Sequence, residues 1–131
     1  MATPERKMAM LIEALRLLAA DYHTQKSLFP DYVLVPEEIA LVFHDCVLLG
    51  DHLVSSGLLT NHQLESVAAI DRELELRSNQ EQKDFWTEQA LRSSETWEKI
   101  RRRAQEALGL LGSRMALPRL DWLTFVPGDQ Q

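Results

Sequence analysis

The sequence predicts an all-α protein, a four-helix up-down bundle with an apolar C-terminal tail packed on it. Apolar residues recur at three- and four-residue intervals in several segments, and helix start and stop signals bound those segments. The connections between the segments are short, as in a bundle. A length of 131 residues with 45% hydrophobic residues is typical of one globular domain. We therefore expect residues 1–131 to form a single helical domain.

The first helix is predicted to begin at Thr3-Pro4-Glu5 and to run to about His23. Thr3 can cap the helix, Pro4 suits its first turn, and Glu5 favours the positive end of the helix dipole. Apolar residues then share one face, which we assign to the core: Met8, Leu11, Ile12, Leu15, Leu18, Ala19 and Tyr22.

A connector and a second helix follow. Residues 28–36 hold two prolines with β-favouring residues between them, which predicts an extended or turn conformation. Pro36-Glu37-Glu38 repeats the proline and dipole signals of a helix start, and Gly57 is well placed to end the helix in the left-handed conformation. The second helix is therefore predicted over about residues 36–56.

The third helix is predicted to begin at Thr60-Asn61-His62-Gln63, which fits a capping box. A weaker stripe follows it, formed by Leu64, Val67, Ala68, Asp71 and Leu74. The polar run Ser78–Asp84 has too few apolar residues to pack tightly, so it predicts a surface loop.

The fourth helix is predicted from Ser94 to Gly112, after a short helical turn that begins at Thr87. Its inward face is predicted to hold Trp97, Ile100, Ala104, Ala107, Leu108 and Leu111. The basic run Arg101–Arg103 is flanked by Glu98 and Glu106 at helical spacing, which indicates a solvated face with ion pairs within the helix.

The tail Leu117–Pro127 is too apolar for an ordinary frayed end. It either folds back over the bundle or docks on a neighbouring molecule. We favour the first interpretation, because large aromatic side chains left in water promote aggregation.

The net charge of −6 is concentrated in one part of the chain. Residues 21–65 carry seven acidic side chains and one basic side chain, Lys26. Such a field repels a phosphate backbone and attracts a basic protein, so nucleic-acid binding is not expected. The chain has neither a long apolar run nor an apolar start, which argues against a membrane span and against export. The single cysteine fits a reducing compartment, and we expect a cytoplasmic protein.

The second predicted helix holds the candidate binding surface. Apolar residues cover one broad arc, and Leu41 and Leu48 fall inside the opposite, polar arc. Either another helix or the tail covers these two leucines, or they are anchors of a protein interface ringed by carboxylates. The second interpretation gives these partner-binding residues: Glu37, Glu38, Leu41, His44, Asp45, Leu48, Asp51 and His52.

Catalytic and metal-binding interpretations of the same residues are less favourable. Glu37, His44 and Asp51 are seven residues apart, about 10.5 Å along a helix, which is too far for one ion to bridge. Cys46 lies in the apolar arc, where burial makes a thiol unreactive. We therefore predict no catalytic residue, no metal and no cofactor. Phe85 and Trp86 could stack on a ligand, although packing under the loop is the commoner role for such a pair.

The segments LFPDYVLVPEEIALVFHDC and DFWTEQALRSSETWEKIRRRAQEALGLLG, between Leu28 and Gly112, resemble the small acidic helical immunity proteins that bacteria pair with antagonistic toxins. The shared features are an acidic, proline-bounded helix start and a Trp-containing amphipathic helix. Immunity proteins have no common inhibitory motif, so the resemblance assigns no individual residue a role. It implies binding rather than catalysis, with a cognate toxin as the partner.

These observations lead to one functional expectation and two alternatives. We expect a non-enzymatic immunity protein that neutralises a toxin, such as a basic nuclease domain, through its acidic surface. The first alternative is an interaction or assembly module that forms a homodimer through the second helix or the tail. The second is a small-ligand-binding bundle or small enzyme with a pocket among Phe85, Trp86 and the histidines. The protein is a monomer or a homodimer in these interpretations.

Overall fold

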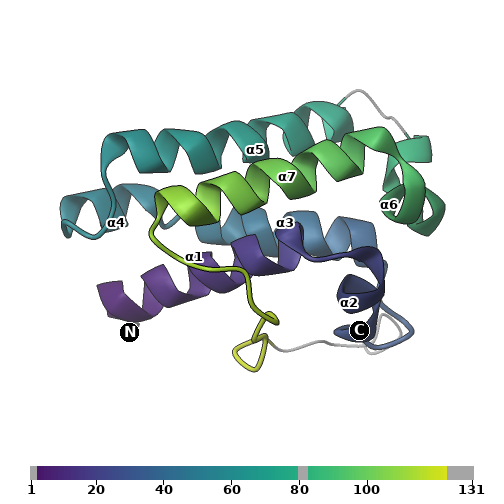
Figure 1. Ribbon diagram of the computed structural model, residues 1–131, viewed down its shortest axis with the longest axis horizontal. Coiled ribbons are helices and arrows are strands. Elements are labelled where there is room, and N and C mark those ends of the chain that lie inside the picture. Colours follow the sequence, from purple (N-terminus) through teal and green to yellow (C-terminus); the bar gives the residue numbers. More distant parts are fainter. Residues whose placement is uncertain (1–2, 80–82, 124–131) are drawn as a thin grey trace.

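The computed structural model describes residues 3–79 and 83–123, and helices make up most of this part of the chain. Figure 1 shows their arrangement. The elements are α1 (Pro4–Ala19), α2 (Tyr22–Ser27), α3 (Val35–Val47), α4 (Gly50–Ser55), α5 (Asn61–Asn79), the 3₁₀ helix η1 (Lys83–Trp86), α6 (Glu88–Ser93) and α7 (Glu95–Leu110). The described residues contain no strand, so the predicted all-α class is confirmed.

The core lies among the four longer helices. α1 packs most extensively on α7 and on α3, and α5 packs on both α3 and α7 (Figure 1). The predicted core residues Leu11, Leu15 and Leu18 of α1 are fully buried, as are Trp97 and Ile100 of α7. The periodicity of the apolar residues therefore identified the inward faces of both helices correctly.

The first helix is shorter than predicted. Thr3 caps it as expected, with its hydroxyl accepting a hydrogen bond from the Arg6 amide at 3.1 Å. The helix ends at Ala19 rather than near His23, because the Asp21 side chain accepts from the Thr24 amide at 2.8 Å and caps the separate helix α2.

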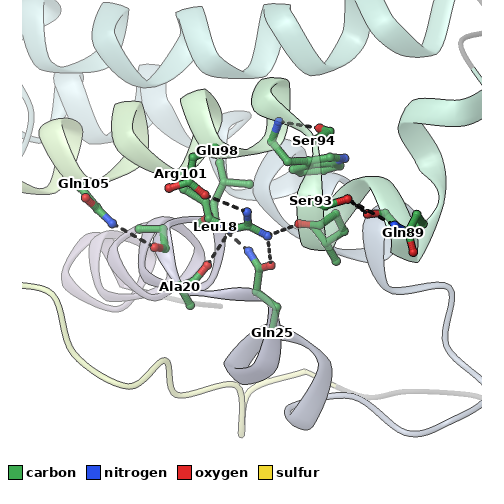
Figure 2. Close-up of polar contacts among 12 residues, drawn as sticks. Leu18, Ala20, Gln25, Gln89, Ser93, Ser94, Glu98, Arg101 and Gln105 are labelled. Atoms are coloured by element: carbon green, nitrogen blue, oxygen red, sulfur yellow. Dashed lines mark hydrogen bonds and ion pairs between the residues drawn. The ribbon is translucent and has the colours of Figure 1, made fainter.

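Polar side chains close the C-terminal end of α1 (Figure 2). The Gln25 amide donates to the carbonyls of residues 17 and 18 at 3.1 and 3.3 Å, and the Gln105 amide donates to the carbonyl of residue 19 at 3.3 Å. Arg101 Nε donates to the carbonyl of Ala20 at 3.0 Å. Side chains thus donate to four successive carbonyls at the end of α1, and the first of these, that of Leu17, also accepts from the Ala20 amide at 3.3 Å.

The prediction of a solvated basic face at Arg101–Arg103 is wrong for Arg101. Only 5% of Arg101 is exposed, whereas Arg102 and Arg103 are exposed as expected. Its Nη2 donates to Gln25 Oε1 at 3.0 Å and to the Leu91 carbonyl, and its Nη1 lies 3.3 Å from Glu98 Oε2. Arg101 is buried because its guanidinium lies at the negative end of the α1 dipole and among carbonyls that need donors.

The predicted helix over residues 36–56 is two helices. α3 ends at Val47, and a turn at residues 48–49, where the Leu49 amide donates to the Cys46 carbonyl at 3.1 Å, separates it from α4. A Cβ at Gly50 would lie 2.3 Å from a Leu64 methyl of α5, so the absence of a side chain permits close packing there. Gly57 has a φ of 80° and follows α4 as predicted.

The capping box at the start of α5 is confirmed. The Gln63 amide donates to Thr60 Oγ1 at 3.0 Å, and the Thr60 amide donates to Gln63 Oε1 at 2.9 Å. The surface loop predicted over Ser78–Asp84 is wrong at both ends, because α5 continues to Asn79 and η1 begins at Lys83. Residues 80–82 lie outside the described residues.

Aromatic packing and the tail complete the core. Phe85 of η1 stacks on Trp97 with ring centroids 4.5 Å apart, and the Trp97 indole donates to the Phe85 carbonyl at 2.8 Å. Of the tail, Leu120, Trp122 and Leu123 pack against the core, and the amide of residue 119 donates to Glu13 of α1 at 2.8 Å. Residues 124–127 of the predicted tail lie outside the described residues.

Candidate protein-binding groove

A groove of about 780 Å³ lies between α3 and α5, and η1 contributes to its wall. Each helix lines it with residues at positions i, i+3, i+4 and i+7, which form one face of a helix. The lining residues are Glu37, Ala40, Leu41 and His44 from α3, Asp71, Leu74, Glu75 and Ser78 from α5, and Lys83 and Trp86 from η1. Two helical faces and one aromatic side chain thus enclose a surface that combines apolar and charged residues.

An ion pair joins the two helices inside the groove. His44 Nδ1 lies 2.8 Å from Asp71 Oδ2, with side-chain exposed fractions of 43% and 12%. The hydrogen bond to Asp71 raises the pKa of His44 above its ordinary value, and the nearby charges of Asp45 and Glu75 act in the same direction. The pair therefore favours a protonated His44 and takes up one of the carboxylates in the groove.

Two other carboxylates in the groove lack a basic partner. Within the described residues, neither Glu37 nor Glu75 forms an ion pair with a lysine, arginine or histidine. Lys83 is exposed at the η1 end and has no ion-pair partner among these residues either. The groove consequently carries more negative than positive charge.

The structure brings together three of the eight sequence-predicted binding residues. Glu37, Leu41 and His44 line the groove, and 52% of Leu41 is exposed. Glu38 and Asp45 lie on α3 but do not line the groove. Burial, followed by the negative charge of Asp45, raises the pKa of Glu38 above its ordinary value.

The other three predicted residues are separated from the groove by the break in the helix. Leu48 lies in the turn and is 67% exposed, so neither it nor Leu41 is covered by another described helix. Asp51 and His52 belong to α4, and His52 Nδ1 lies 3.0 Å from the Lys7 ammonium of α1. A single continuous helix would have aligned all eight residues along one face, and the turn at residues 48–49 prevents this.

Sequence reasoning missed the half of the groove that α5 supplies. Asp71 was assigned to the weak apolar stripe of α5, and Glu75 was not considered for the binding surface. The available signal was the spacing of residues 71, 74, 75 and 78, which repeats the spacing of 37, 40, 41 and 44 on α3. The sequence does not show that these two helix faces pack side by side, so the matching spacing could not identify a groove before the fold was known.

Burial argues against the two alternative sites, the aromatic pair Phe85–Trp86 and the thiol of Cys46. Phe85 is buried against Trp97, so of the two neighbouring aromatic residues only Trp86 lines the groove. Burial raises the pKa of the Cys46 thiol to about 12, with a smaller effect from Asp45, so the thiolate that would act as a nucleophile is not populated near neutral pH.

Residues 3–79 and 83–123 contain no group of three or more His, Cys, Asp or Glu side chains placed to hold a metal ion. In the same residues, no helix combines the length and the apolar character needed to cross a membrane. Comparison of the chain with protein-family models, with curated proteins and with solved structures found no match.

Proposed function

We propose that this chain is a non-catalytic binding protein that neutralises a toxin, acting as an immunity protein in the cytoplasm. It would bind the toxin through the α3–α5 groove and the adjoining exposed leucines, and so cover the toxin's active site or another surface the toxin needs. The observation that carries the proposal is the exposure of Leu41 in the groove that also holds Glu37 and Glu75, two carboxylates without an ion-pair partner within the described residues. Leu48, in the turn after α3, is exposed as well.

Physical arguments support a protein as the partner. Protein interfaces combine an apolar centre with a polar rim. The exposed Leu41 and the half-buried Trp86 offer apolar side chains for such a centre here. The surrounding negative charge would speed the encounter with a basic toxin domain. We also propose that α1, α3, α5 and α7 form an up-down bundle that carries this surface, which is supported by the contacts of each of these helices with two of the other three.

A growth assay tests the toxin-neutralising role. Each gene next to this one in its source genome is expressed in a bacterial host, with and without this chain. We expect one product to arrest growth, and we expect this chain to restore growth and to form a complex with that product. The proposal is wrong if no product arrests growth, or if the chain fails to relieve the arrest.

A double variant then tests whether the exposed leucines form the interface. Leu41→Ala with Leu48→Ala should speed dissociation of the complex about tenfold, because buried anchors mainly set the dissociation rate. Its free energy of unfolding should change little, since both side chains are more than half exposed in the free protein. Leu110→Ala with Leu117→Ala removes two similarly exposed leucines elsewhere and should leave dissociation unchanged. Equal effects of the two double variants would contradict this interface.

The carboxylates of Glu38 and Asp45 on α3 should affect the association rate of the complex. Glu38→Gln with Asp45→Asn should slow association and flatten its dependence on salt, because charges at a rim mainly set the association rate. Surface plasmon resonance at several salt concentrations measures both rates. An unchanged salt dependence would show that these two residues lie outside the electrostatic rim.

The groove also favours a second candidate function, the binding of a small ligand. Its volume of about 780 Å³ falls within the range of small-molecule pockets, and Trp86 and His44 offer a stacking surface and a polar group. Native mass spectrometry of protein purified from its source separates the candidates, because a retained small molecule favours ligand binding. The same measurement in dilute solution gives the mass of the assembly, which distinguishes a monomeric inhibitor from a homodimeric module.

A further inference from the structure

We propose that the α3–α5 groove receives one basic side chain, lysine or arginine, from a short segment of the protein partner that also carries an aliphatic residue beside it. This inference rests on the proposed function and specifies the chemistry of the partner at the groove. Three features of the groove lead to it: its length, its two carboxylates without an ion-pair partner within the described residues, and the apolar residues that line it with them.

The length of the groove suits a short segment. Residues 37–44 of α3 and residues 71–78 of α5 each cover about two helical turns, or about 10.5 Å along the axis. Two turns can contact only a few side chains of a partner. One apolar and one basic side chain, at adjacent positions or one helical turn apart, would therefore fill most of this length.

The charges in the groove select a cation. Asp71 is already bonded to His44, whereas Glu37 and Glu75 have no basic partner within the described residues. An acidic occupant would meet these two carboxylates and would find Lys83 as the only lysine or arginine among the described residues that line the groove. A basic occupant would be attracted by both carboxylates and repelled by Lys83 at one end, while the positive charge of a protonated His44 is paired with Asp71.

The apolar surface selects the shape of that cation. Ala40, Leu41, Leu74 and Trp86 lie in the same groove as the carboxylates. Lysine and arginine carry an apolar stem below the charged head, so one side chain can pack on these residues and still reach a carboxylate. The Trp86 ring adds a surface on which a guanidinium or an ammonium stacks favourably.

A selection experiment tests the inference without knowledge of the partner. The full chain is immobilised and used to select binders from a random dodecapeptide phage library. We expect the selected peptides to be enriched in lysine or arginine next to, or one helical turn from, an aliphatic residue. Selected peptides that are neutral or acidic, or a selection that yields no binder, would overturn the inference.

Matched variants locate the contact in the groove. Glu37→Gln with Glu75→Gln should weaken the selected peptides about three- to tenfold, the range for two partly solvated charge pairs. Glu95→Gln with Glu106→Gln changes the net charge equally on exposed residues of α7 and should have no such effect. Lys83→Gln should strengthen binding, because it removes the repulsive charge. Equal weakening by both double variants, or weakening by Lys83→Gln, would overturn the inference.

Methyl chemical shifts provide a readout that is independent of affinity. Addition of a selected peptide should move the methyl signals of Ala40, Leu41 and Leu74 and leave those of Leu110 and Leu117 in place. Shifts confined to other parts of the molecule would refute docking in the groove. Growth rescue without selection of basic peptides contradicts this inference alone, whereas selection of basic peptides in the groove without growth rescue contradicts only the toxin-neutralising role.

Discussion

Arg101→Met should destabilise the protein far more than the same change at either neighbouring arginine. The guanidinium of Arg101 donates to the carbonyls of Ala20 and Leu91 and to the side-chain oxygen of Gln25, and all of these bonds are buried. Methionine keeps most of the apolar stem but donates no hydrogen bond. The substitution therefore leaves three buried acceptors without this donor while it changes the packing little.

The expected loss in the free energy of unfolding follows from those three acceptors. A buried acceptor that loses its partner costs about 1–3 kcal/mol, so we expect at least about 3 kcal/mol in total. The loss of a positive charge at the C-terminal end of α1 adds roughly 0.3–1 kcal/mol. The ion pair with Glu98 contributes little, because that side chain is 58% exposed. A domain of this size has a free energy of unfolding of about 5–15 kcal/mol, so the variant should still fold.

Urea denaturation followed by circular dichroism measures the effect, with Arg102→Met and Arg103→Met as controls. Both control residues are exposed on the same helix, and each variant should lie within about 0.5 kcal/mol of the parent protein. Arg101→Lys should be intermediate, since one ammonium cannot serve all of the acceptors that the planar guanidinium contacts. A loss below about 1 kcal/mol for Arg101→Met, or equal losses at all three positions, would refute the reasoning.

Three further predictions concern the core and the groove. Leu15→Ala should cost about 2–5 kcal/mol in denaturation, because Leu15 is fully buried between α1 and its neighbours, and a loss of a few tenths would show that it is not a core residue. Cys46 should react slowly with a thiol reagent in the native protein and rapidly after unfolding, since burial raises its pKa to about 12, and equal rates would contradict its burial. The pKa of His44, measured by NMR, should lie above about 6.5 and fall toward that value in Asp71→Asn. Because the pKa of His44 is higher in the folded state, the pair should stabilise the fold fully at a pH below the unfolded pKa and lose this contribution as the pH rises through the folded pKa. A pH-independent difference in the free energy of unfolding between the parent and Asp71→Asn would contradict this sign.

Signals that act over a few residues could be predicted from the sequence alone. The Thr3 cap, the reciprocal bonds of Thr60 and Gln63, and the left-handed glycines at positions 57 and 112 all depend on neighbours within one or two helical turns. The buried faces of α1 and α7 were also predictable, because a periodic apolar stripe has a free-energy reason to leave water whatever it packs against. The same reasoning predicted the all-α class.

Features that depend on two distant segments were decided only by the tertiary structure. The charge pattern of residues 101–103 is the same whether each arginine faces water or not, and Arg101 is buried because the carbonyls at the end of α1 and of α6 lie beside it. The break at residues 48–49 accompanies the close approach of Leu64 to Gly50. The groove exists because the fold places Asp71 and Glu75 of α5, together with Trp86 of η1, beside α3. A hydrogen bond or an apolar contact depends on distance in space, and the order of residues along the chain does not specify that distance for segments that meet only after folding.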